Sequence, residues 1–225
     1  MTRLLVHVEG ETEETFVNEI LRPFLIGVGY VDVSARLLGN ARARSRRGGI
    51  KAWATVKSDI SKHLAGDQGC IATTMVDYYA LPADPATGWP GRSTAPLVGI
   101  ETRGHHVQEA LRNDFSASPY SQRFEPFVLM HEFEALLFSD CVRFAEAIGH
   151  PNQATAFQAV RDLFRTPEHI NDSPQTAPSK RVISIVNNYE KPLLGTLAAL
   201  EIGIPIMRAQ CPHFDTWLRV LESKI

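Results

Sequence analysis

The sequence predicts an α/β protein whose parallel sheet is flanked by helices and followed by a helical C-terminal region. Three short apolar segments, residues 4–8, 70–76 and 127–130, have the composition of buried strands. Segments with helical spacing alternate with them, which is typical of a parallel sheet with crossover helices. Beyond the last strand only helical patterns follow. We expect an α/β domain over residues 1–140 and a helical region over residues 141–225 packed on it.

The first strand leads through a turn into a helix. Residues 4–8 are mostly apolar and partly β-branched, and they end at Glu9 and Gly10. Thr12 is a suitable N-cap, and Pro23 is expected to end or kink the helix because it has no backbone N–H. The apolar face of this helix recurs every four residues, at Phe16, Ile20 and Phe24.

The middle of the chain repeats this alternation. Residues 31–38 have strand character, residues 39–49 form a polar basic loop, and residues 53–64 place apolar groups at helical spacing. Residues 81–96 are rich in Pro, Gly and Thr, which predicts another loop. The helical region is predicted to contain helices at 144–148, 154–164, 179–189, 193–201 and 214–221.

Composition limits the class of protein. The formal net charge of −2 provides no strong overall field for nucleic acid, so such binding would need a local patch. The three cysteines, Cys70, Cys141 and Cys211, form no CxxC pair, which argues against a disulfide framework or a thiolate zinc site. No signal peptide pattern and no membrane-spanning apolar stretch is present. We expect a cytoplasmic protein with no membrane partner.

Acidic residues follow three of the predicted strands, at Glu9, Asp77 and Glu132. The carboxyl ends of parallel strands meet at one edge of a sheet, where ligands of α/β proteins bind. Glu13 opens the first helix, and Glu134 lies two residues beyond Glu132, so both can add to the same volume. Carboxylates gathered in one place repel one another unless a hard cation such as Mg²⁺ or Mn²⁺ shares the space. The sequence therefore predicts a divalent metal site.

Each acid also has a local structural explanation. Glu13 suits the positive end of a helix dipole, and Asp77 suits a turn after a strand. Glu132 and Glu134 suit the N-terminus of a helix. These roles need no ligand, and it is the expected common location of the acids that favours a metal site.

Several short motifs carry a resemblance to known proteins. The run VEGETEE, which begins at Val8, resembles the first motif of Toprim domains, particularly those of overcoming-lysogenization-defect (OLD) nucleases. The run MVDYY, which begins at Met75, falls where those domains carry Asp-x-Asp. Together with MVDYYALP, MHEFEALLFSD, APSKR and CPHFDTWL, these segments resemble the bacterial domain-of-unknown-function family 4276, which is regarded as Toprim-like. The resemblance spans nearly the whole chain.

The resemblance implies a Toprim-like sheet and a metal-dependent nuclease. Glu9 would handle the proton or the metal at the scissile phosphate, and Glu13 and Asp77 would be metal ligands. Tyr79 stands where Toprim proteins usually place a second Asp, so Glu132 or Glu134 would supply the missing charge. Two ions could then stabilise the attacking and leaving oxygens during phosphodiester hydrolysis. An AAA- or ABC-type ATPase encoded nearby, and a role in antiviral defence, are further implications.

Basic residues form two candidate contacts with DNA or RNA. The densest run consists of Arg42, Arg44, Arg46, Arg47 and Lys51. It could hold a phosphate backbone, or it could be a solvated loop. Lys180 and Arg181 open a predicted helix, where a cation could neutralise charge on a transferring phosphate, or could be ordinary surface charge. Trp53 and Trp89 could stack on bases or be buried anchors.

Other activities have less support in the sequence. The main alternative is a non-catalytic module that binds nucleic acid or nucleotide, with Tyr79 leaving too little charge to hold reactive metal. A zinc peptidase would need a second His after His131, and Cys211 with His213 defines no hydrolase dyad. Tyr78 and Tyr79 lie inside the metal motif, whereas a topoisomerase needs a Tyr nucleophile on a separate domain.

Overall fold

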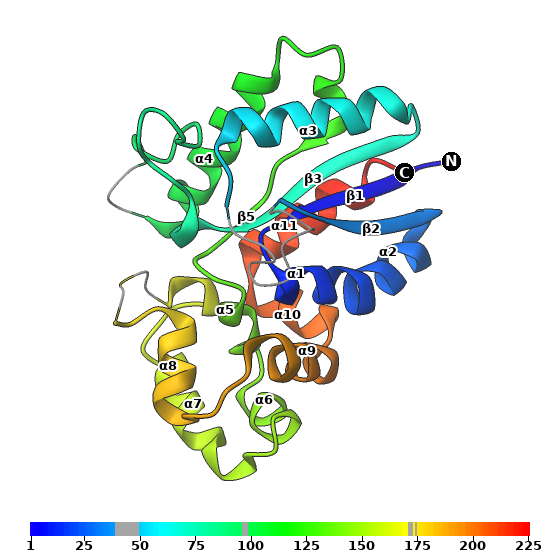
Figure 1. Ribbon diagram of the computed structural model, residues 1–225. Coiled ribbons are helices and arrows are strands. Elements are labelled where there is room, and N and C mark those ends of the chain that lie inside the picture. The colour runs from blue at the N-terminus through cyan, green and yellow to red at the C-terminus, as the bar shows by residue number, and fades with distance from the viewer. Residues whose placement is uncertain (39–49, 96–98, 171–172, 174) are drawn as a thin grey trace.

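The computed structural model describes residues 1–38, 50–95, 99–170, 173 and 175–225. Its parallel sheet has the strand order β2, β1, β3, β4, and β5 also pairs with β3 (Figure 1). The strands are β1 (Arg3–Val8), β2 (Asp32–Leu37), β3 (Cys70–Asp77), β4 (Phe124–Glu125) and β5 (Val128–Leu129). The predicted α/β class, with a parallel sheet flanked by helices, is confirmed.

The strand register aligns the carboxyl ends of the strands. Val8, the last residue of β1, pairs with Leu37 in β2 and with Met75 in β3. Asp77, the last residue of β3, pairs with Leu129 in β5. The residues that follow β1, β3 and β5 therefore leave the sheet at the same edge.

The first helical segment continues beyond the expected bend. It consists of α1 (Glu11–Phe16), a π-helical segment (Val17–Leu21) and α2 (Arg22–Val28). The N-cap is Gly10 and not Thr12, because Glu13 reaches back to accept the Gly10 N–H at 3.0 Å. Pro23 does not end the helix, because it lies in the first turn of α2, where a missing N–H is tolerated.

Two helices cover one face of the sheet. They are α3 (Trp53–Gly66) and α4 (Ile100–Phe115), and both contribute to one apolar cluster with β3 and β5. The bounds of α4 were not predicted, since most of its residues are polar and its buried apolar side chains are few. Trp53 and Trp89 lie in this cluster with their ring centroids 5.1 Å apart, so they are buried anchors.

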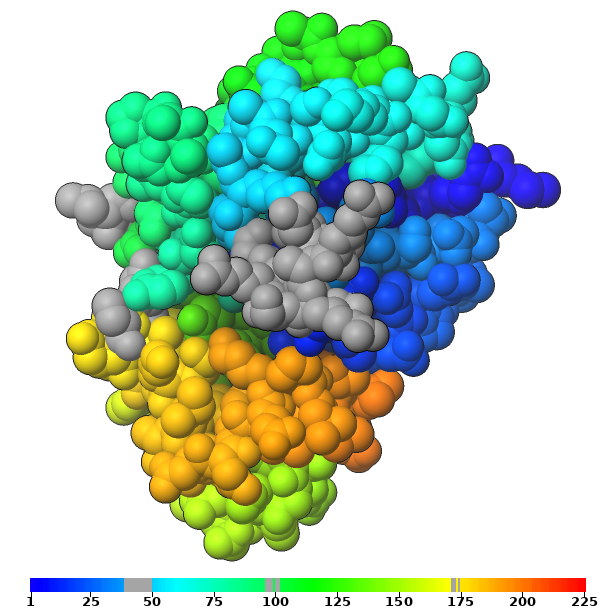
Figure 2. Space-filling view, in the orientation of Figure 1, coloured from blue at the N-terminus to red at the C-terminus, as the bar shows by residue number. Residues whose placement is uncertain are grey.

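The C-terminal half of the chain is helical, as predicted. A helix lies over each of the five predicted segments, and shorter helices connect them. The elements are α5 (Glu134–Leu137), α6 (Cys141–Ala147), α7 (Ala154–Arg161), α8 (Pro178–Ile185), α9 (Lys191–Ile202), α10 (Ile204–Gln210) and α11 (Pro212–Glu222). In the space-filling view, α8 and α9 form much of the visible surface below the sheet domain (Figure 2).

The last helix, α11, packs on the second face of the sheet. The ring of Trp217 stacks on Phe127 with centroids 4.3 Å apart, and its Nε1 donates to Thr73 Oγ1 at 3.0 Å. The Tyr30 hydroxyl donates to the carbonyl oxygen of Leu221 at 2.8 Å. One apolar core therefore contains side chains from β1, from α1 and from the C-terminal helices.

Within the part of the chain that the structure describes, no single helix combines the length and apolar character needed to cross a membrane. One pair of helices, α9 and α10, passes such a test jointly, with a bend of 85° between them.

Candidate functional site

Five acidic side chains gather where β1, β3 and β5 end. Glu9 follows β1, Asp77 ends β3, and Glu132 lies shortly after β5. Glu13 comes from α1 and Glu134 from the first turn of α5. Burial raises the pKa of Asp77, and the negative charges of the other four acids add to the shift, which places these four carboxylates within electrostatic reach of Asp77. The structure thus brings together the acids that the strand pattern singled out.

Backbone amides hold three of the carboxylates by one oxygen each. The pairs are Gly10 to Glu13 at 3.0 Å, Phe133 to Asp77 at 3.1 Å and Ser179 to Glu132 at 3.0 Å. Among the described residues, these are the only hydrogen bonds that the three side chains accept from other residues. Such single contacts fix the orientation of each carboxylate while leaving its second oxygen available to a ligand.

The carboxylate of Glu9 is only partly compensated by its neighbours. Its Oε2 is buried and has no hydrogen-bond partner in the described part of the chain. Burial and the charge of Glu13 raise the pKa of Glu9 to about 7, although the backbone of Asp77 and the Lys191 ammonium partly offset this. A carboxyl with this pKa can take up or release a proton near neutral pH.

The other acids are also held in a form that resists ionisation. Burial raises the pKa of Asp77 well above its usual range, and the charges of its acidic neighbours add to the shift. Burial likewise raises the pKa of Glu13 and of Glu134. A cation among these groups would lower all of these pKa values, because it stabilises the ionised carboxylates.

A lysine that the sequence did not point to provides the counter-charge. Lys191 is the first residue of α9, and its Nζ lies 3.2 Å from each oxygen of Glu134. Burial lowers the pKa of Lys191, but the charges of Glu134, Glu132 and Asp77 outweigh burial, and the net pKa is raised. A lysine in the first turn of a helix opposes the helix dipole, which is the one signal in the sequence that could have indicated an acidic partner.

Tyr189 lies beside this ion pair. Its side chain is buried, and its hydroxyl has no hydrogen-bond partner among the residues described. Burial raises the pKa of Tyr189, and the charge of Glu134 adds to the shift. The close approach of α9 depends on Gly195, because a Cβ at this position would lie 2.9 Å from the Tyr189 hydroxyl.

The predicted cations of α8 do not pair with the acids in the way that Lys191 does. Lys180 is exposed, and no ion pair joins it to an acid in the described ranges. Arg181 donates from Nε to the carbonyl oxygen of Thr176 at 3.0 Å and lies over the Phe164 ring, 5.2 Å from its centroid. A role for either residue with phosphate stays a prediction.

The predicted basic loop is only partly described. Arg42, Arg44, Arg46 and Arg47 lie outside the described residues. Lys51 is half-buried, and its carbonyl oxygen accepts a hydrogen bond from Trp89 Nε1 at 2.9 Å. Tyr79, which stands in place of the second Asp, has an exposed side chain next to the site.

Cys211 and His213 are buried structural residues. The Sγ of Cys211 lies 3.4 Å from Ser139 Oγ, and the Nε2 of His213 lies 3.0 Å from the carbonyl oxygen of Val128. Burial raises the pKa of Cys211 well above its usual range, which disfavours the thiolate that a nucleophile requires. This supports the sequence interpretation that the pair is no hydrolase dyad.

The chemistry of the acidic site suits a hard divalent ion. Carboxylate oxygens are the ligands that Mg²⁺ and Mn²⁺ prefer. The Oε2 of Glu9 is buried and accepts no hydrogen bond in the described part of the chain, and a bound cation would satisfy it. In the described residues, however, no three His, Cys, Asp or Glu side chains stand in positions that could already hold a metal ion. The chemical type of these donors therefore matches such an ion, whereas their present arrangement does not form a complete coordination site in the described residues.

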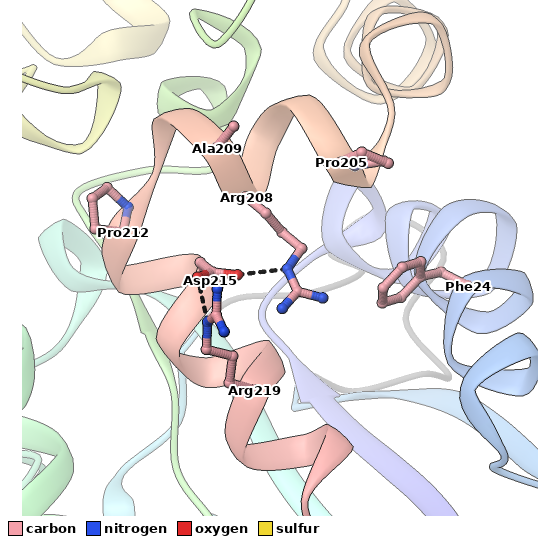
Figure 3. A pocket seen from close by; sticks show the side chains of 7 residues that line it. All are labelled: Phe24, Pro205, Arg208, Ala209, Pro212, Asp215 and Arg219. Carbon is pink, nitrogen blue, oxygen red and sulfur yellow. Dashed lines mark hydrogen bonds and ion pairs between the residues drawn. The ribbon is translucent and has the colours of Figure 1, made fainter.

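A cavity away from the acidic site lies between α2, α10 and α11. It measures about 570 Å³, and Phe24, Arg208, Asp215 and Arg219 are among its lining residues (Figure 3). Both arginines are ion-paired with Asp215, and Arg208 also pairs with Glu222. The charges in this cavity are already satisfied within the protein, unlike those of the acidic site.

Comparison with known proteins gives a family but no activity. The model of a family described as a domain of unknown function (DUF4276) matches residues 8–222. No curated protein and no solved structure matches the chain.

Proposed function

We propose that this chain, which belongs to the DUF4276 family, is a divalent-metal-dependent phosphodiester hydrolase that cleaves nucleic acid. The observation that carries the proposal is the gathering of five carboxylates at one sheet edge, with a buried and unpartnered oxygen on Glu9. Such a cluster stores unfavourable electrostatic energy, which a bound cation would relieve. Buried acids with strongly raised pKa values cluster at functional sites.

The residues have distinct roles in this proposal. Glu13, Asp77 and Glu132 hold Mg²⁺ or Mn²⁺, and Glu134 adds its charge to the same volume. The metal supplies polarisation of a phosphoryl oxygen and stabilisation of negative charge when it is bound. Glu9 exchanges a proton with the attacking water, for which a pKa of about 7 is suitable.

Basic residues outside the acidic site would hold the nucleic acid. Arg181, together with Arg42, Arg44, Arg46, Arg47 and Lys51, is proposed to contact the phosphate backbone without reading its bases. Lys180 is proposed to lie near the transferring phosphate. These contacts would provide the local positive patch that the near-neutral net charge otherwise lacks.

Cleavage assays test the proposal directly. Purified protein is incubated with end-labelled single-stranded DNA, duplex DNA and RNA in Mg²⁺ or Mn²⁺. Glu9→Gln and Asp77→Asn are expected to lose cleavage by at least about a hundredfold, since each removes a charge that the reaction needs. Glu19→Gln is the matched control, because Glu19 is exposed on the π-helical segment. Absence of cleavage with both metals and all three substrates would reject the proposal.

A second candidate function is a non-catalytic module that binds nucleic acid or nucleotide. It is favoured by the absence, among described residues, of three donors already arranged around a metal position. The ion pair of Lys191 with Glu134 also supplies an internal counter-charge. Calorimetric titration distinguishes the two functions, because no heat of binding at millimolar Mg²⁺ supports the non-catalytic module.

Wider aspects of the proposal rest on the resemblance to Toprim-like proteins. They are a cytoplasmic location, an AAA- or ABC-type ATPase as partner, and a role in antiviral defence. Co-purification from native cells at endogenous levels tests the partner. Recovery of the chain without any ATPase would remove this part of the proposal and leave the nuclease unaffected.

A further inference from the structure

Lys191 occupies an unusual position for a lysine. It is the first residue of α9, so its ammonium lies at the positive end of the helix dipole. It is held there by Glu134, whose side chain is only 1% exposed, through contacts of 3.2 Å to both carboxylate oxygens. The ion pair therefore offsets the unfavourable placement of both groups.

The ion pair leaves three buried polar atoms of the site without a hydrogen bond among the described residues. The Oε1 of Glu134 is buried, and its contact with Lys191 lacks the geometry of a hydrogen bond. The Tyr189 hydroxyl, in a side chain that is 7% exposed, and the Oε2 of Glu9 are also buried without a hydrogen-bond partner among described residues. These three buried groups indicate that the site awaits a further charged or polar species.

The side chain of Lys191 is able to leave the site. It is 41% exposed, in contrast to that of Glu134. A lysine carries its charge on a flexible four-carbon stem, so the ammonium can move into solvent while the backbone stays in place. A divalent ion brings twice the charge of the ammonium and accepts several carboxylates at once.

We propose that Lys191 is the resident counter-ion of the carboxylate site and that a divalent metal ion displaces its ammonium from Glu134. This inference rests on the proposed metal-dependent function and adds a competition between a side chain and the metal. The ammonium stabilises the metal-free protein and opposes metal binding, because two cations in the same volume repel each other.

Metal titration of charge-removing variants tests the competition. Mn²⁺ binding is measured by calorimetry for the intact chain, for Lys191→Met and for Lys191→Gln. Both variants are expected to bind Mn²⁺ at least about tenfold more tightly, since the competing charge is gone. Lys191→Gln keeps a group that can donate to Glu134, which guards against loss of folding. Lys62→Met, which removes an exposed lysine on α3, is expected to leave the affinity unchanged.

A second measurement uses the unaltered protein. The ¹³Cε resonance of Lys191, assigned by its absence in Lys191→Arg, is expected to move towards the position of solvent-exposed lysines during a Mg²⁺ titration. A resonance that stays in place while Mg²⁺ binds would overturn the proposal.

The outcomes separate this inference from the function on which it rests. Equal or weaker Mn²⁺ binding by both Lys191 variants, with clear binding by the intact chain, overturns the counter-ion role alone. Binding by the variants but not by the intact chain supports the counter-ion role and counts against a metal-dependent enzyme. Absence of binding by all of the proteins overturns both.

Discussion

The backbone N–H of Ser179 donates to Glu132 Oε2 across 3.0 Å, which joins the first turn of α8 to the acidic site. Both residues are buried. The N-terminus of a helix carries unsatisfied N–H groups and partial positive charge, so it stabilises a carboxylate at this position. Glu132 consequently serves the packing of the helical region as well as the site.

This contact predicts a loss of stability when Glu132 is truncated. Glu132→Ala removes the acceptor and leaves a buried N–H, which is expected to lower the free energy of unfolding by about 1–3 kcal/mol. Glu132→Gln keeps an acceptor and should cost less. Urea denaturation followed by circular dichroism measures both, with the exposed Glu146→Ala as control. A Glu132→Ala variant as stable as the control would show that the contact contributes nothing.

The pKa of Glu9 predicts that its replacement stabilises the protein at alkaline pH. The pKa is about 7 in the folded protein against about 4.5 for an ordinary Glu, so the folded state holds its proton more tightly. Below pH 4.5 both states are protonated and no penalty arises. As the pH rises towards 8, ionisation favours the unfolded state by about 3 kcal/mol.

Glu9→Gln removes that penalty. Its stability advantage over the unaltered chain is expected to be small near pH 4, to grow between pH 4.5 and 7, and to remain constant above pH 7. Urea titrations without metal at several pH values give the curve. A pH-independent difference would mean that Glu9 has an ordinary pKa.

The raised pKa values also predict that metal binding releases protons. Glu9 must ionise to compensate a cation, so Mn²⁺ affinity should fall by up to about tenfold per pH unit as the pH decreases from 7 towards 5.5. Calorimetry in two buffers of different ionisation enthalpy counts the protons released. Glu9→Gln should flatten the pH dependence, whereas Glu19→Gln should not. Binding without proton release at pH 6 would contradict the prediction.

The contacts of Glu168 with the start of α11 predict a large loss of stability when this side chain is truncated. Its two oxygens accept the backbone N–H groups of His213 at 3.0 Å and of Phe214 at 2.9 Å, at the start of α11. Glu168→Ala leaves these buried donors without their acceptor and is expected to cost about 2–4 kcal/mol. Thermal denaturation should show a lower Tm than for Glu201→Ala, an exposed change on α9. Equal Tm values would refute the capping role.

The arginines of the predicted basic loop, which lies outside the described residues, are expected to give a salt-dependent interaction with nucleic acid. Replacing Arg42, Arg44, Arg46 and Arg47 together by Gln should weaken binding of single-stranded DNA at low salt. The slope of log K against log salt should flatten by about 0.7 for each phosphate that the variant no longer neutralises. Fluorescence anisotropy measures both, and Mn²⁺ affinity should be unchanged. An unaltered slope would show that the loop does not bind phosphate.

The strand pattern was sufficient to predict the fold class and the place where the acids gather. Segments such as 70–76 are apolar throughout, which identifies buried parallel strands without further information. Parallel pairing then places Glu9, Asp77 and Glu132 at one edge by geometry alone. By contrast, the extent of α4 was not predicted, because its amphipathic pattern is interrupted by polar residues such as Gln108, which is buried.

Features that depend on distant segments were not predictable from the sequence. Lys191 contacts Glu134 because the connection from α8 to α9 returns to the sheet edge. The residues around Lys191 do not indicate the direction of this connection. Glu168 caps α11 from 45 residues away, and its own surroundings give no sign of that role. Helix boundaries differed from the predicted ones where more than one residue was a suitable N-cap. The first helix begins after Gly10 and not after Thr12, because the Glu13 side chain accepts the Gly10 N–H.

The packing of α11 on the sheet also has a consequence for biosynthesis. Trp217 and Leu221 complete contacts with Thr73 and Tyr30, residues that a ribosome adds much earlier. Until the α11 segment has been translated, one face of the nascent sheet lacks its cover and exposes apolar strands. Contacts between such distant residues form slowly, so the growing polypeptide is expected to depend on chaperones that shield unfinished sheets from aggregation.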